Sequence, residues 1–217
     1  MFSALKMLSG TRYLVRRLQT RFVMRAVSGR SFETVADIGA GKAPYKKFIS
    51  CKKYIGVDVE DRGGVPDVLI EDINLGLSLA NESVDLVLCT EVLEHVKKPA
   101  FVLKELHRIL KKDGMLVLTT PMVWPVHEAP NDYFRYTNFG LEYLAKEAGF
   151  DDVTVCGSNG YFYSLCQLSL LRLRHAIFIP IVLFMNAVGF LFGKFEKNTE
   201  FPLGQQMIAR KKQALFL

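Results

Sequence analysis

The feature that most limits the fold is a series of short apolar runs, three of which carry an acidic residue at or next to their end. These runs lie at residues 35–38, 53–59, 67–73, 83–91 and 114–121. Because apolar residues do not alternate with polar ones, each strand should be covered on both faces, which is typical of a parallel sheet. Helical patterns separate several of the runs. The alternation predicts an open α/β sheet with ligands at the carboxyl ends of its strands.

The first run leads into a glycine-rich turn, where residues 35–44 spell VADIGAGKAP. Gly39 and Gly41 leave bare backbone at the end of the strand, and a helix opened by Pro44 would point amide donors at a ligand there. The spacing lacks the GK[ST] ending of a P-loop and the third glycine of a dinucleotide fingerprint. Taken alone, the stretch is equally consistent with a tight turn that binds nothing.

Four motifs in order strengthen the ligand interpretation. They are DIGAG at 37–41, Asp58, the pair Asp72-Ile73, and CTEVLEHV at 89–96. Together they resemble the class I S-adenosylmethionine-dependent methyltransferases, type 11, over residues 32–157 and a final strand near 205–211. The resemblance implies a Rossmann-like, doubly wound, seven-stranded sheet whose last strand is antiparallel. Ala43 replaces a glycine that many members carry, and because alanine is also small we expect little consequence.

The resemblance also implies that S-adenosyl-L-methionine is the cofactor. DIGAG would hold its methionine end, Asp58 its ribose and the pair Asp72-Ile73 its adenine. Excess acid at this edge suits the positive charge of a sulfonium. The residues expected to bind the cofactor are Asp37, Gly39, Ala40, Gly41, Asp58, Val59, Asp72, Ile73, Thr90 and Glu91. Alignment of the reacting groups can supply much of the rate of a displacement, so neither a metal nor a covalent nucleophile is expected.

A loop after the fifth run carries the side chains best suited to an acceptor. Residues 121–136 combine three prolines with aromatic, acidic and basic residues, and irregular loops at the active edge commonly contact substrates. An alcohol acceptor must lose a proton, so His127 is the first candidate for the catalytic base and His95 the second. The expected substrate-binding residues are Trp124, Glu128, Asp132, Tyr133 and Arg135.

Structural roles stay open for the same side chains. His127 and Arg135 could instead pin the loop through hydrogen bonds, and His95 could orient or support its neighbours. A metal cluster of His127, Glu128 and Asp132 is not expected, because its spacing matches no established ligand template.

The loop sequence also resembles methyltransferases of bacterial surface-polysaccharide gene clusters. That resemblance implies methyl transfer to a hydroxyl of a sugar or a lipid-linked glycan. Two alternatives remain: a methyltransferase for another apolar small molecule, such as a quinone or a lipid, and an inactive membrane adaptor that binds the cofactor.

Residues 1–30 form a segment of different character from the rest of the chain. They hold seven of the 28 basic residues and none of the 22 acidic ones, so residues 31–217, the expected methyltransferase domain, are close to neutral. Leu14, Leu18 and Phe22 fall on one helical face. This basic amphipathic helix could lie on an anionic membrane or pack on the domain. It also has the composition of a mitochondrial transit peptide, although no cleavage site marks one.

An apolar insertion at 158–202 separates the last two expected strands, 152–156 and 205–211. Residues 176–193 carry no charge and approach the length of a membrane span. A single crossing is incompatible with two neighbouring strands in one sheet, so we expect a helical hairpin at about 161–174 and 177–195. Its apolar surface could meet a membrane, a lipid-linked substrate, a second subunit in a homodimer, or its own core.

Four scattered cysteines, at positions 51, 89, 156 and 166, form no Cys-x-x-Cys pair. They favour a reducing, cytoplasmic location, with peripheral contact at the inner face of the cytoplasmic membrane through 1–28 and 161–195. Because the basic excess is confined to one segment, nucleic acid is not expected as a partner.

Overall fold

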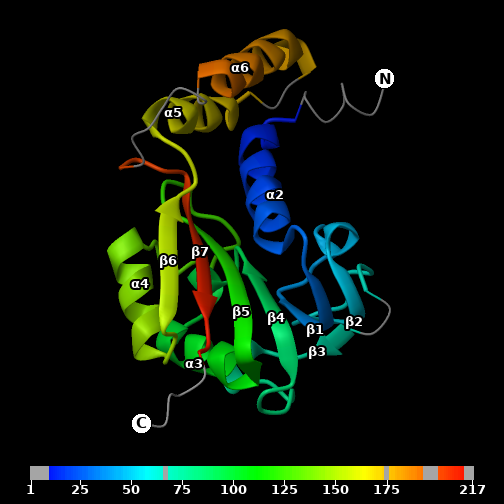
Figure 1. Cartoon of the computed structure of the whole chain (residues 1–217). Helices are drawn as coiled ribbons and strands as arrows, with labels where there is room; N and C mark the ends of the chain where they lie inside the picture. The colour runs from blue at the N-terminus through cyan, green and yellow to red at the C-terminus, as the bar shows by residue number, and fades with distance from the viewer. Residues whose placement is uncertain (1–9, 66–67, 174–175, 193–199, 213–217) are drawn as a thin grey trace.

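The computed structural model describes residues 10–65, 68–173, 176–192 and 200–212, and its centre is one mixed sheet of seven strands (Figure 1). The strand order is β3-β2-β1-β4-β5-β7-β6, and β7 runs antiparallel to both β5 and β6. The expected doubly wound sheet with an antiparallel last strand is confirmed. The strands are β1 Ser31–Ile38, β2 Ser50–Asp58, β3 Val68–Ile70, β4 Val84–Thr90, β5 Leu110–Pro121, β6 Asp152–Gly157 and β7 Gly204–Arg210.

Helices cover both faces of the sheet. The α-helices are α2 Tyr13–Val27, α3 Pro99–Ile109, α4 Asn138–Glu147, α5 Tyr161–Leu170 and α6 Ile179–Phe192, and the short 3-10 helices are η1 Lys46–Phe48, η2 Ile73–Leu75, η3 Leu93–His95 and η4 Ala176–Phe178. Proline occupies the first turn of α3, where its missing N–H costs nothing. Thr137 caps α4, because its side chain accepts a hydrogen bond from the Gly140 amide.

The central strands are buried on both faces, which explains their continuous apolar sequence. In β4, Val87 and Cys89 pack with α3 and α4, whereas Leu86 and Leu88 pack on the opposite face with the C-terminal half of α2. Each fully buried aliphatic side chain contributes about 1.5–3 kcal/mol relative to exposure. Packing on both faces therefore holds the carboxyl ends of these strands in fixed positions along one edge of the sheet.

One expected element is absent, because Pro44 does not open an α-helix. The segment between β1 and β2 contains only the three-residue η1. Gly39, Gly41 and Ala43 all have positive φ, and β2 begins 12 residues after β1 ends. Because the connection is short and contains several residues with positive φ, it leaves no room for a full α-helix. The backbone around the glycines offers its amides from a turn instead.

The hairpin of α5 and α6 follows β6 and precedes β7 along the chain. It lies beyond the carboxyl edge of the sheet and packs against the start of α2 (Figure 1). Leu14 is fully buried in a separate core with Tyr163, Leu170 and Val182. A Cβ on Gly189 of α6 would lie 2.9 Å from Leu14 Cδ1, so glycine permits this close packing. The expected ends at 174 and 193–195 fall outside the described residues.

Hydrogen bonds reinforce the junction between α5 and α2. Tyr163 Oη donates to the Leu14 carbonyl, and Gln167 both donates to the Thr11 carbonyl and accepts from the Val15 amide. The apolar face of α2 is therefore occupied by this chain's own helices. Among the described residues, none of the helices has the length and hydrophobicity needed to span a bilayer.

Candidate active site

Two adjoining cavities open at the carboxyl edge of the sheet, each of about 200 Å³. The first lies beyond β1 and β2, and we name it the β2 cavity. The second lies between the ends of β5 and β7, the loop after β5, and helix α2, and we name it the α2 cavity. Glu91, His95 and Glu128 line both of them. A ligand in one cavity would therefore lie beside a ligand in the other.

The backbone of the glycine turn forms the floor of the β2 cavity. Gly39 has φ +66° and a Cβ there would lie 2.3 Å from Val92 Cγ2, so only glycine fits. Gly41 has φ +53° and open space around its missing side chain. Its amide donates to Asp58 Oδ2 at 2.8 Å, and the Val59 amide donates to Asp58 Oδ1 at 2.8 Å. Asp58 therefore ties the turn after β1 to the end of β2.

The β2 cavity gathers most of the residues expected to bind the cofactor. Those that line it are Gly39, Gly41, Asp58, Val59, Asp72, Ile73 and Glu91. Ala40 is buried in the turn, and Thr90 ends β4 without lining the cavity. Arg62, Glu71 and Asn74 also line it. The sequence analysis missed these three, although each lies within four residues of an expected one.

Asp37 lies beneath the cavity rather than in its wall. Its buried carboxylate accepts a 2.6 Å hydrogen bond from the Tyr54 hydroxyl. Burial raises the pKa of Asp37 to about 7, although the Tyr54 hydrogen bond opposes that rise. Of the residues that line the β2 cavity itself, five are acidic and Arg62 is the one lysine or arginine. This excess of acid, with apolar Ile38, Ile73 and Val92 alongside, fits a cationic ligand that carries an adenine.

A cluster of Glu94, His95 and His127 lies where the two cavities meet. Glu94 is fully buried, and its Oε1 has no hydrogen-bond partner among the described residues. That oxygen lies 3.6 Å from His95 Nε2 and 3.9 Å from His127 Nε2. The two imidazole rings meet edge to face with centroids 4.8 Å apart. Burial, with the nearby charge of Glu91, raises the pKa of Glu94 well above its usual value.

The loop that carries His127 is fastened by an internal ion pair. Arg135 contacts both carboxylate oxygens of Asp132, at 2.6 and 2.8 Å, and donates to the carbonyls of Trp124 and Pro125. Asp132 Oδ2 in turn accepts from the His127 amide at 2.9 Å and lies 3.3 Å from His127 Nδ1, without hydrogen-bond geometry to that atom. The Arg135 guanidinium holds the pKa of Asp132 far below its usual range.

The expected acceptor residues therefore divide into two groups. His127, Trp124 and Glu128 line the α2 cavity, as does His95, whose Nδ1–H donates to the Asn131 carbonyl. The other three do not line it. Asp132 and Arg135 form the ion pair, and the Tyr133 hydroxyl donates to Asn131 Oδ1.

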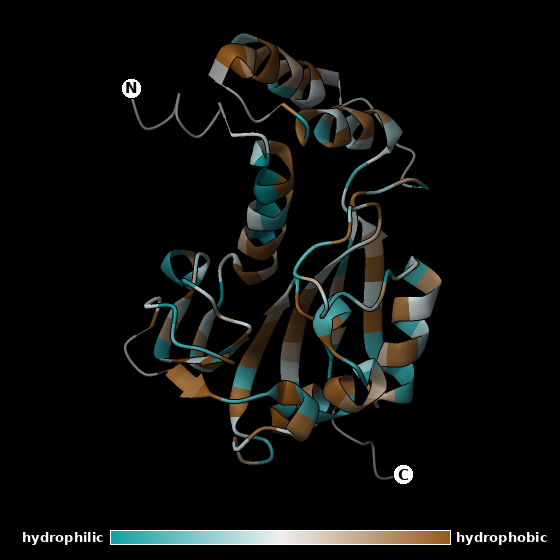
Figure 2. Ribbon diagram, turned by 180° about the vertical axis from the view of Figure 1, so that it is seen from behind, coloured by the Kyte–Doolittle hydropathy of each residue, from teal (hydrophilic) through white to brown (hydrophobic). Residues whose placement is uncertain are grey.

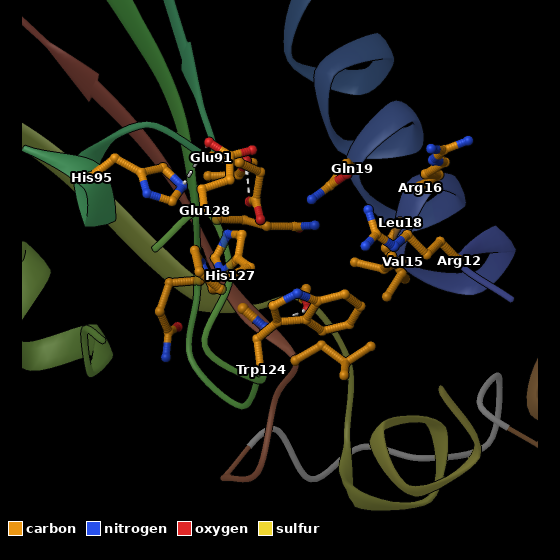
Figure 3. A pocket seen from close by; sticks show the side chains of 17 residues that line it. Arg12, Val15, Arg16, Leu18, Gln19, Glu91, His95, Trp124, His127 and Glu128 are labelled. Carbon is orange, nitrogen blue, oxygen red and sulfur yellow. Dashed lines mark hydrogen bonds and ion pairs between the residues drawn. The ribbon is translucent and has the colours of Figure 1, made fainter. Parts of the chain in front are cut away.

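Helix α2 supplies a wall that the sequence analysis did not assign to the site. Figure 3 shows its residues facing Glu91, His127 and Trp124 across the cavity. The helix itself was expected, but nothing in its sequence says what its polar face meets. The contributors from distant parts of the chain include Arg12, which precedes α2, and Val15, Arg16, Leu18 and Gln19 of α2, together with Thr119, Ser158, Leu203, Gln205 and Gln206.

Glu94, His95 and His127 are also the described residues that could hold a metal ion. One ligand atom from each lies within 4.8 Å of the others. A carboxylate with two imidazoles suits zinc, iron or manganese. The set weighed from the sequence, His127 with Glu128 and Asp132, does not assemble in this way, because Asp132 is engaged by Arg135.

Comparison with known proteins agrees with this geometry. Residues 36–118 match the family model described as a methyltransferase domain. A Mycobacterium tuberculosis protein named a probable S-adenosylmethionine-dependent methyltransferase is 30% identical over 57% of this chain and 50% of its own length. The ubiquinone biosynthesis O-methyltransferase of Pseudomonas entomophila is 31% identical over 52% of this chain and 43% of its own.

A solved S-adenosylmethionine-dependent methyltransferase of Archaeoglobus fulgidus shares the fold, with a TM-score of 0.61 at 18% identity, covering 97% of this chain and 99% of the other. The chain spans about half the length of the curated relatives that it matches. The β2 cavity, the sheet order and these matches together support a class I S-adenosylmethionine-dependent methyltransferase domain in this chain, with S-adenosylmethionine as its cofactor.

Proposed function

We propose that this chain transfers a methyl group to a hydroxyl of a sugar or a lipid-linked glycan held in the α2 cavity. The observation that carries the proposal is the position of His127, a potential base, in the wall of a cavity that adjoins the β2 cavity. When bound, S-adenosylmethionine supplies an electrophilic methyl carbon on a sulfonium. The protein then has to align the acceptor oxygen and take up its proton.

The residues of the β2 cavity would hold the donor. The open backbone at Gly41 and the carboxylate of Asp58 suit the methionine and ribose ends, and Asp72 with Ile73 suits the adenine. Glu91 is common to both cavities and is kept in place by the Thr119 hydroxyl, which donates to its Oε1 at 2.8 Å. Glu91 would therefore lie beside the positive sulfonium of the cofactor, where the methyl group meets the acceptor.

His127 is placed to accept the proton of the acceptor through Nε2. Asp132 lies on its Nδ1 side at 3.3 Å and Glu94 on its Nε2 side at 3.9 Å. The Asp132 carboxylate, whose pKa is held low, stabilises the imidazolium that forms when the ring takes up a proton. Because the Arg135–Asp132 ion pair fixes the loop, the ring is held in position before substrate arrives.

The lining of the α2 cavity supports a polar acceptor with an apolar part. Trp124 offers an aromatic face, and Gln19, Glu128 and Gln205 offer polar atoms around it. Val15, Leu18 and Leu203 make the remaining wall apolar. The ubiquinone O-methyltransferase relatives support transfer to oxygen and keep a quinol as the runner-up acceptor.

The direct test is a methyl-transfer screen with radiolabelled S-adenosylmethionine over nucleotide-linked sugars, lipid-linked sugars and quinols. We expect turnover with a sugar hydroxyl and its loss in His127→Ala. Turnover only with quinols would move the assignment to the runner-up. Cofactor binding without turnover on any acceptor would favour the inactive adaptor.

A second candidate mechanism replaces the base by a divalent cation on Glu94, His95 and His127. The unsatisfied Glu94 Oε1, facing two imidazole nitrogens, favours it. The chemistry supplied there would be a lowered pKa of the acceptor hydroxyl. Dialysis against a chelator separates the two mechanisms. An unchanged rate supports His127 as the base, whereas loss of activity that Zn²⁺, Mn²⁺ or Mg²⁺ restores supports the metal.

A further inference from the structure

The outer side of the α5–α6 hairpin exposes large apolar side chains. We name Ile177, Ile179, Ile181, Phe184 and Leu191 the hairpin face. Ile177 is 80% exposed and Phe184 is 66% exposed. Figure 2 shows hydrophobic residues concentrated on these helices, at the end of the molecule far from the C-terminus. Exposed large apolar side chains gathered on one hairpin are typical of an interaction site.

The chain's own core does not account for this face. Helix α6 already buries its other side, because Val182, Asn186 and Gly189 face inward against α2 and α5. A helix that packs on a domain needs one apolar stripe and keeps a polar stripe for water. Helix α6 has no charged residue anywhere along its 14 residues. The composition of α6 therefore indicates that the hairpin face, on the side away from α2 and α5, also meets an apolar environment.

The charge around the hairpin identifies that environment. Residues 1–32 and 153–195 contain no aspartate or glutamate, and they include the whole of α2, α5 and α6. Arg12, just before α2, and Arg172, after α5, are exposed and line one cavity beside the end of α5. Arginines beside an exposed apolar face match the two layers of a bilayer surface, with anionic headgroups outside and acyl chains beneath.

We propose that the hairpin face inserts into the surface of an anionic phospholipid bilayer, with Arg12 and Arg172 against its headgroups. Each basic residue near such a surface contributes about 1 kcal/mol. A second copy of this chain is the weaker occupant, because pairing two hairpin faces would bring together two ends that carry arginine and no acid. Like charges across an interface oppose association.

The position of the hairpin links this docking to the site. A third cavity, lined by Arg12, Trp124, His127, Leu171 and Arg172, lies between the end of α5 and the loop after β5. It shares Arg12, Trp124 and His127 with the α2 cavity. Docking through the hairpin would therefore bring the reaction site close to molecules anchored in the bilayer. The docking itself does not depend on the proposed chemistry.

Vesicle flotation of the full chain tests the proposal. We expect binding to vesicles of phosphatidylcholine with phosphatidylglycerol, weaker binding to phosphatidylcholine alone, and a decrease with added salt. Ile181→Asp together with Phe184→Asp should lower the bound fraction at least about tenfold, because two apolar anchors are lost. Phe139→Asp is the matched control, since Phe139 is 76% exposed on α4, away from the hairpin. It should bind like the wild type.

Unchanged flotation of the double variant would overturn the proposal, provided that its circular dichroism and cofactor affinity match the wild type. A wild-type dimer in light scattering that the double variant converts to monomer would also overturn it, in favour of a second copy. The outcome is separable from the proposed function. A chain that floats without methylating supports docking alone, and a chain that methylates without floating contradicts docking alone.

Discussion

The two cavities at the carboxyl edge are assembled in different ways. The β2 cavity takes nearly all its wall from residues 38–96, where each strand end contributes a few consecutive residues. The α2 cavity takes its wall from five separate parts of the chain, between Arg12 and Gln206. The proposed donor site is thus a property of local turns on a rigid sheet, whereas the proposed acceptor site exists only when distant segments pack together.

The cavities also differ in charge. The β2 cavity is dominated by carboxylates, which suits the positive sulfonium. The α2 cavity brings Arg12 and Arg16 opposite Glu91 and Glu128, and His95 and His127 also line it. This contrast predicts that variants in the β2 cavity will change the cofactor Kd, whereas variants in the α2 cavity will change turnover or the acceptor KM.

The largest expected effect follows from removing the base. His127→Ala should lower kcat by about 10²–10⁴-fold, the usual contribution of a positioned general base. The Kd for S-adenosylmethionine, measured by calorimetry, should stay within about twofold because His127 does not line the β2 cavity. Steady-state rates with the acceptor found in the screen provide the check. Equal loss of cofactor affinity would show that the two cavities are not independent.

A core substitution should affect the acceptor side before the donor side. Leu14→Ala removes a fully buried side chain that joins α2 to the hairpin, at a cost of about 2–5 kcal/mol in the free energy of unfolding. Denaturant unfolding measures that cost. The acceptor KM should rise while cofactor Kd stays unchanged. Met24→Ala on the same helix is the control, since Met24 is 43% exposed. An unchanged KM would contradict the role of α2 as a cavity wall.

The matching experiment on the donor side is Asp58→Ala. It removes the acceptor of hydrogen bonds from the Gly41 and Val59 amides, and bonds to a charged group contribute about 1.5–3 kcal/mol. We expect the Kd for S-adenosylmethionine to rise about 10–100-fold. Asp58→Asn keeps one acceptor oxygen, so its Kd for S-adenosylmethionine should fall between those of the wild type and Asp58→Ala. Unchanged cofactor binding in Asp58→Ala would remove Asp58 from the site.

The smallest expected effect concerns pH. The folded pKa of Asp37, about 7, exceeds its unfolded value near 3.8. Its contribution to stability is therefore full below about pH 4 and is lost as the pH rises through 7. Tyr54 donates to the charged form, so Tyr54→Phe should cost about 1 kcal/mol more at pH 8 than at pH 5. Urea unfolding at both values measures the difference, and an equal cost would show that Asp37 is not charged at pH 8.

How far the sequence could predict the molecule depends on the range of the interactions. The apolar runs predicted the first five strands, because burial on both faces leaves a local pattern. The last two strands, at 152–156 and 205–211, were expected from the family resemblance. Pro44 was misleading, since the length of the connection to β2 decides whether a helix fits. From the sequence, His127 was a candidate base and Arg135 a candidate substrate-binding residue, but either could instead have pinned the loop. Their roles separated only when Arg135 was found paired with Asp132 and His127 facing Glu94.

By itself, the sequence determined the sheet and the donor side of the site, because glycines with positive φ and acids at strand ends act through neighbouring backbone. Tertiary structure decided the acceptor side. The basic helix could face a membrane or its own domain, and the packing of Leu14 against the hairpin placed its arginines at the mouth of the α2 cavity. Long-range packing of apolar surface is not written in any one segment, so only the folded chain shows where the acceptor would meet His127.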